Sequence, residues 1–71
     1  MTTKTDRETR GQRIRRLRRL RKLTQAEAAT LAGWRQQNWQ TLEADQRSPT
    51  LQTLRTVARV LRVKVGRLVE P

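Results

Sequence analysis

The stretch TQAEAATLAGWRQQNWQTLE, residues 24–43, predicts two short helices joined by a tight turn. Thr24 is followed three residues later by Glu27. At this spacing a hydroxyl caps the first free N–H groups of a helix, while the carboxylate reaches back to the cap residue. The alanines that follow favour a helix, and Gly33 can adopt the left-handed conformation in which many helices end. A second helix is therefore expected from about Arg35 to Ala44.

The second of these helices is rich in side-chain amides. Trp39 is its one apolar residue between positions 36 and 41, and Leu42 follows at helical spacing, so a narrow apolar stripe stands against a wide polar face. Gln and Asn can form two hydrogen bonds with the major-groove edge of adenine, and Thr can contact a thymine methyl. This face therefore predicts base reading, with a merely solvated polar face as the alternative.

The order of these residues resembles the helix-turn-helix of the lambda-repressor and Cro-like family, also called the xenobiotic-response-element type. The residues that carry the resemblance are Thr24, Gln25, Gly33, Trp34, Trp39 and Glu43. It continues through Ser48-Pro49-Thr50-Leu51-Gln52-Thr53-Leu54 and covers about Arg13 to Leu68. The resemblance implies an all-α, five-helix lambda-repressor-like fold, in which residues 9–71 form one helix-turn-helix DNA-binding domain.

The resemblance also implies roles for individual side chains. Base contacts fall on Gln36, Gln37, Asn38 and Thr41. Phosphate contacts fall on Thr24, Gln25, Arg35, Gln40, Gln46 and Arg47. Arg18 stands where the family commonly has an arginine that pairs with the glutamate ending the recognition helix, which is Glu43 here. Arg35 replaces the usual hydroxyl cap and sets a cation against the positive end of the helix dipole. A nearby phosphate or guanine would explain that choice, and an arginine that bends into solvent is the alternative.

The first helix is expected from about Arg10 to Lys22, where Ile14, Leu17 and Leu20 form one apolar stripe among arginines. Interfacial membrane helices share this combination. However, the stripe lacks Trp and Phe, so a face that covers the other helices is the simpler explanation. Most of these arginines are expected to be solvated.

Both tryptophans are assigned to the core rather than to base stacking. Ala28 and Ala32 stand where the family usually has Leu, and Trp34 and Trp39 stand where it usually has Val and Ile. Because interiors are close-packed, small residues on one helix fit large rings on the next.

The last third of the chain predicts the main core helix and a short, weak fifth helix. Thr50 is a good cap, and the apolar residues after it follow a period of 3.6. The apolar residues of the final segment are Val63, Val65, Leu68 and Val69. They predict a dimer surface, with closure of the core as the alternative.

Composition limits the function. The 71 residues carry a net charge of +11 and contain no cysteine and no histidine, so we expect no disulfide, no metal or other cofactor, and no enzyme activity. A polyanionic partner is expected, namely nucleic acid or an acidic membrane surface. A polar N-terminus favours an intracellular protein, and the resemblance implies a cytoplasmic one, prokaryotic or phage-encoded and associated with the nucleoid. Residues 1–8 are interpreted as a disordered basic arm that reaches DNA through Lys4, Arg7 and Arg10, or as a frayed terminus.

Together these features predict a sequence-specific regulator of transcription that binds double-stranded DNA. As a homodimer it would place two helices in successive major grooves, about 34–36 Å apart, and repress by occupancy. Three alternatives are an antitoxin with a toxin partner, a non-specific nucleoid or RNA-binding protein, and a membrane-active basic peptide.

Overall fold

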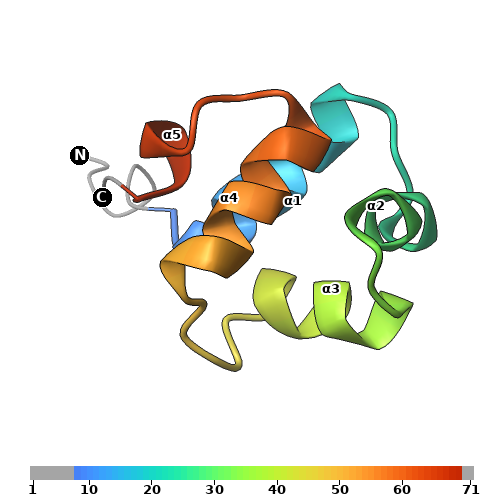
Figure 1. The fold of residues 1–71 in the computed structure, drawn as a ribbon, viewed down its shortest axis with the longest axis horizontal. Helices are drawn as coiled ribbons and strands as arrows, with labels where there is room; N and C mark the ends of the chain where they lie inside the picture. The colour runs from blue at the N-terminus through green and yellow to red at the C-terminus, as the bar shows by residue number, and fades with distance from the viewer. Residues whose placement is uncertain (1–7, 70–71) are drawn as a thin grey trace.

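Every regular element in residues 8–69, the part of the chain described by a computed structural model, is a helix (Figure 1). The helices are α1 (Arg10–Leu20), α2 (Gln25–Ala32), α3 (Gln36–Glu43), α4 (Leu51–Leu61) and α5 (Gly66–Val69). The expected all-α, five-helix fold is confirmed. None of these helices is long and apolar enough to span a membrane. The predicted arm, apart from Glu8, lies outside the described residues.

Threonine hydroxyls begin three of the helices. Thr9, Thr24 and Thr50 each accept a hydrogen bond from the backbone N–H three residues later, at 3.0–3.1 Å. The reciprocal cap predicted for Thr24 and Glu27, known as a capping box, is complete, because the Glu27 carboxylate accepts from the Thr24 N–H at 2.8 Å. Helix α3 differs, since its cap residue Arg35 makes no side-chain hydrogen bond to the helix start. The N-terminus of the amide-rich helix therefore lacks a side-chain cap.

Left-handed residues end the helices. Gly33 ends α2 with φ +80°, as its position in the sequence predicts. Lys22, Asp45 and Arg62 adopt φ of +57° or +58° although each carries a Cβ. The left-handed conformation costs about 1–2 kcal/mol in residues other than glycine. At each of the three turns the N–H of the next residue donates to the carbonyl five residues before it, at 3.0–3.2 Å, so local hydrogen bonds offset this cost.

The core is formed where α1 and α4 lie over one another, with the other helices around them (Figure 1). Trp39, Ile14, Val57 and Leu68 are its largest fully buried side chains. Leu20, expected in the apolar stripe of α1, is 69% exposed. Arg18 is buried in the last turn, and the half-buried Arg21, which follows α1, donates from Nη1 to the Val60 carbonyl at 2.5 Å. The stripe therefore consists of Ile14 and Leu17 only.

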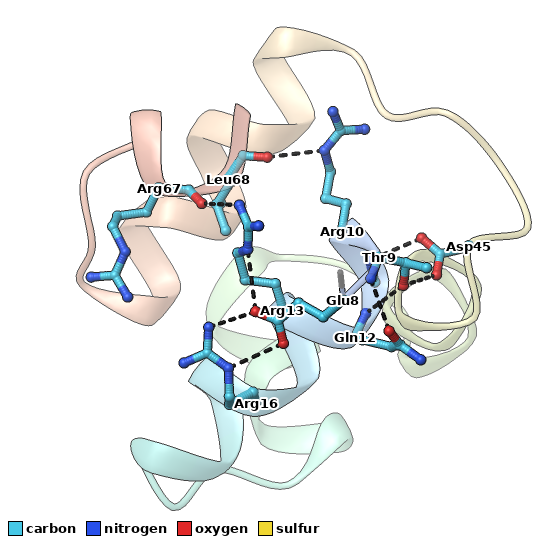
Figure 2. A network of polar contacts seen from close by, with 10 residues as sticks. Glu8, Thr9, Arg10, Gln12, Arg13, Arg16, Asp45, Arg67 and Leu68 are labelled. Carbon is cyan, nitrogen blue, oxygen red and sulfur yellow. Dashed lines mark hydrogen bonds and ion pairs between the residues drawn. The ribbon is translucent and has the colours of Figure 1, made fainter. Parts of the chain in front are cut away.

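Helix α5 closes the core, which corrects the prediction that Leu68 lies on a dimer surface. Leu68 is fully buried, and Val63 and Val65 pack against the core at its edge. Arginines of α1 hold the end of α5 (Figure 2): Arg10 Nε donates to the Leu68 carbonyl and Arg13 Nη1 to the Arg67 carbonyl, both at 2.9 Å. A chain this short needs these apolar residues to cover its own core. Of the predicted dimer surface, Val69 is the residue left exposed.

Gly11 is the point of closest approach between α1 and the end of α3. A Cβ atom at this position would lie 2.4 Å from the Glu43 carbonyl oxygen and 2.7 Å from that of Leu42. The Gly11 N–H donates to Asp45 Oδ1 at 2.9 Å, and Thr9 Oγ1 donates to Asp45 Oδ2 at 2.5 Å. The side chain of Asp45 therefore caps α1 from another element, and only glycine leaves room for this contact.

Two alanine substitutions test the close contact between Gly11 and the end of α3. Gly11→Ala should destabilise the fold by about 1–3 kcal/mol or more, because the new methyl group meets backbone oxygens that cannot move independently. Gly66→Ala is the matched control, since a Cβ there has nothing within 4 Å and alanine favours a helix over glycine by about 0.5–1 kcal/mol. Urea unfolding followed by circular dichroism measures both. Equal stability of the two variants would contradict the close approach.

Candidate nucleic-acid interface

Helix α3 lies along one edge of the molecule, at the bottom of Figure 1. It follows α2 after the left-handed turn at Gly33. The side chains of Gln36, Gln37 and Asn38 are exposed and make no hydrogen bond with the residues that the structure describes. Their amides are therefore free to bond to another molecule.

Thr41 lies beside this face, but its hydroxyl is already hydrogen-bonded within the helix. It is half-buried, and its hydroxyl donates to the Asn38 carbonyl at 2.9 Å, inside the helix. Because the hydroxyl is used there, the part of Thr41 suited to a base contact is its methyl group.

The carboxylate of Glu43, the last residue of α3, joins three helices. Arg18 of α1 donates to it twice, from Nε to Oε2 at 2.5 Å and from Nη2 to Oε1 at 3.1 Å. Trp39 Nε1 donates to Oε2 at 2.6 Å, and Gln25 Nε2 of α2 donates to Oε1 at 2.9 Å. Arg18 and Glu43 are both buried. The structure thus brings together the pair that the resemblance implies and adds two donors that sequence reasoning did not identify.

Gln25 connects this buried centre to the surface. Its amide nitrogen is bonded to Glu43, and its oxygen accepts from Gln40 Nε2 at 3.3 Å. The sequence assigns Gln25 and Gln40 to phosphate contacts, whereas here their amides bond to each other and tie α2 to α3. Both ends of the Gln25 amide are engaged within the protein. A chain of bonds therefore runs from Arg18 to Gln40, on the exposed side of α3.

The protonation state of Glu43 is controlled by this network. Burial raises the pKa of its carboxyl, but the hydrogen bonds from Arg18, Gln25 and Trp39 outweigh that effect, so the pKa of Glu43 lies below its ordinary value. The carboxylate is therefore ionised at neutral pH and accepts all four bonds.

Both tryptophans pack into or against the core, as the sequence predicts, Trp39 from α3 and Trp34 from the turn before it. Trp39 is fully buried and Trp34 is half-buried. Their ring centroids are 6.0 Å apart at an interplanar angle of 44°, a separation typical of aromatic pairs. Because Trp39 is enclosed and its N–H is bonded to Glu43, it has no surface on which a base could stack.

The remaining predicted phosphate contacts come before and after α3 in the chain or at the start of α2. Arg35 precedes α3, and Gln46 and Arg47 follow it. All three side chains are exposed and make no hydrogen bond within the described part of the chain. Thr24 is exposed as well, although its hydroxyl already caps α2.

Several arginines in and just after α1 have internal partners that the charge pattern did not reveal. Arg10, Arg13 and Arg21 donate to carbonyl oxygens of α4 and α5. Arg16 Nη2 pairs with Glu8 Oε1 at 2.6 Å (Figure 2), and that hydrogen bond lowers the pKa of Glu8. Glu8, predicted to belong to the disordered arm, is therefore fixed on α1. Much of the positive charge of this helix serves the fold.

A family model described as a helix-turn-helix domain matches residues 11–70 of the chain. No curated protein and no solved structure matches it. The matched range includes all five helices apart from the first residue of α1. It contains α2, the turn at Gly33 and α3 with its amide face.

The Glu43 network predicts a loss of stability in acid. A carboxylate whose pKa is lowered by folding adds stability above its unfolded pKa of about 4.3, and this is lost as pH falls through that value towards the folded pKa. Glu43→Gln should therefore cost about 3 kcal/mol at pH 7, because it leaves Arg18 buried without a counter-charge. Its unfolding free energy should then change less between pH 6 and pH 3 than that of the unchanged protein.

Urea unfolding at each pH measures this effect. Glu8→Gln is the matched control, since it removes a carboxylate from the partly exposed pairs with Arg13 and Arg16 and should cost at most about 1 kcal/mol at pH 7. If Glu43→Gln and the control behave alike at pH 7, Glu43 does not hold the helices together.

Proposed function

The chain belongs to the helix-turn-helix domain family, and from this premise we propose that it is a sequence-specific regulator of transcription of the lambda-repressor and Cro-like type. The observation that carries the proposal is the amide face of Gln36, Gln37 and Asn38, which is exposed and has no partner within the described residues. Adenine offers an acceptor and a donor side by side in the major groove, which one side-chain amide can match.

The rigid attachment of α3 supports base reading rather than a general attraction to charge. Discrimination between bases requires side chains held on an element that cannot reorient. Glu43 and Asp45 fix the C-terminal end of α3 to α1 and α2. In the proposed complex, the other end of α3 enters the major groove, and Gln36, Gln37 and Asn38 contact base edges.

The cations around this face would position the domain on the duplex. Arg35, just before α3, and Arg47, in the loop after it, are both exposed, and the net charge of +11 draws the protein to DNA. Such phosphate contacts fix register but carry no sequence information by themselves. In this proposal Arg35, Gln46 and Arg47 supply affinity, and the amide face supplies specificity.

Repression by a homodimer completes the proposal. Two copies related by a two-fold axis would place their α3 helices in successive major grooves, about 34–36 Å apart, and so recognise a palindromic site. Val69 is 45% exposed at the end of α5 and is the apolar residue of this segment available to a second copy. The bound dimer would exclude polymerase from an overlapping promoter.

Selection of bound duplexes from a random pool, at near-physiological salt, tests the proposed function. A two-fold symmetric consensus is expected, because each protomer reads one half-site. A pool that shows no enrichment would instead favour the non-specific nucleoid or RNA-binding alternative, in which the arginines alone supply the affinity.

Gln37→Ala tests the amide face. It should weaken binding to the selected site by about 1–3 kcal/mol and leave binding to a scrambled duplex unchanged, because only base contacts discriminate between sequences. Gln52→Ala is the matched control, since it removes an exposed glutamine from α4. Fluorescence anisotropy at one salt concentration measures all the complexes. If Gln37→Ala weakens both duplexes equally, Gln37 does not read a base.

A further inference from the structure

A half-open pocket of about 330 Å³ lies between the start of α1 and the loop from α3 to α4. Its floor is formed by Ile14 and Leu42, which are buried, and its remaining surface is mostly polar. Arg10 lines it from α1, and Arg47 and Ser48 line it from the loop. The two cations are far apart in the sequence, one at the start of α1 and one in the loop after α3, so this combination cannot be read from one sequence motif.

The pocket offers several unused hydrogen-bond donors. The Nε of Arg10 donates to the Leu68 carbonyl. The two terminal nitrogens of Arg10 extend away from α1 beyond that bond (Figure 2). The Arg47 guanidinium, the Ser48 hydroxyl and the backbone N–H groups of both residues donate to no acceptor in the described part of the chain. Planar guanidinium groups and backbone N–H groups are the donors that bind phosphate oxygens in proteins.

Asp45 is the one acidic residue in the lining. Its two oxygens are held by the Gly11 N–H and the Thr9 hydroxyl, so the carboxylate caps α1 instead of pairing with Arg10 or Arg47. The lining therefore carries two guanidinium groups against one carboxylate that is already bonded. The net positive charge of the lining favours the binding of an anion.

We propose that this pocket binds a phosphate monoester whose phosphate lies between Arg10 and Arg47. The volume exceeds that of a phosphate group alone and lies at the lower end of the range of small-molecule sites, about 300–1,000 Å³. The mostly polar lining suits a hydroxylated body such as a sugar better than an apolar one. The phosphate has two possible sources, a free ester or the DNA backbone, and we assign the pocket to the free ester. This inference does not rest on the proposed function, but the two share Arg47, so the ester and a DNA duplex are expected to compete for the pocket.

Titration with ribose 5-phosphate, followed by calorimetry at constant ionic strength, tests the pocket, with inorganic phosphate and ribose as reference probes. Saturable binding with one site per chain is expected for ribose 5-phosphate, weaker binding for inorganic phosphate, and none for ribose. Binding that does not saturate, or that ribose reproduces, would overturn the proposal.

Charge-matched variants separate the pocket from the general positive charge. Arg47→Gln should weaken ribose 5-phosphate binding about tenfold, as expected for one charge-assisted hydrogen bond, and it removes no contact of the fold. Arg59→Gln is the control, since it removes an exposed arginine of α4 that does not line the pocket, and its affinity should stay within about twofold. Equal weakening in the two variants would mean diffuse attraction and would overturn the site.

Arg10→Gln should also weaken the ester, with circular dichroism used to check that the fold survives the loss of the bond to Leu68. The source of the phosphate is tested with dimethyl phosphate, a diester like the DNA backbone, in place of ribose 5-phosphate. Weaker binding of the diester supports the free ester. Binding of the diester as tight as that of ribose 5-phosphate would overturn that assignment and identify a backbone phosphate as the occupant.

Discussion

The carboxylate of Glu43 is the group on which the arrangement of the first three helices depends. It takes four hydrogen bonds, from Arg18, Gln25 and Trp39, inside a core where an unpaired charge would be costly. Each donor comes from a different place along the chain, so the bonds can all form only when α1, α2 and α3 have reached their final positions. The buried charge therefore specifies one arrangement of these helices, whereas apolar contacts alone would tolerate small shifts.

A second contact that joins α1 to the end of α3 is made by Asp45, two residues after Glu43. Asp45 caps the start of α1 through Thr9 and Gly11, and the absence of a side chain at Gly11 lets the two backbones approach. The contacts of Glu43 and Asp45 both lie at the C-terminal end of α3, while Gln36, Gln37 and Asn38 occupy its first turn. The helix is thus anchored at one end and presents unbonded amides at the other. This division keeps the groups that hold α3 apart from those proposed to read DNA.

The sequence predicted the features that depend on local chemistry. The capping box at Thr24 and the left-handed Gly33 follow from preferences of single residues, and the five-helix order follows from periodicity and resemblance. Features that depend on distant partners were missed or misplaced. Nothing near Gly11 in the chain indicates that the end of α3 lies against it. Leu68 was assigned to a dimer surface because a run of arginines in the first helix does not indicate that two of them bond to the carbonyls of α5. Among the site residues, exposure of the amide face followed from its polarity, whereas the Gln25 to Gln40 bond required knowledge of how α2 and α3 pack.

The contact between Trp34 and Trp39 has an optical consequence. The chain has no tyrosine or phenylalanine, so its near-ultraviolet absorption and emission come from these two indoles, which lie 6.0 Å apart. One of them is bonded to an ionised carboxylate. Their coupling and emission wavelength therefore report directly on the packing of the helix-turn-helix, while backbone dichroism reports on the helices themselves. Comparing the two signals during unfolding distinguishes a cooperative transition from a state in which the helices persist after α3 has come loose.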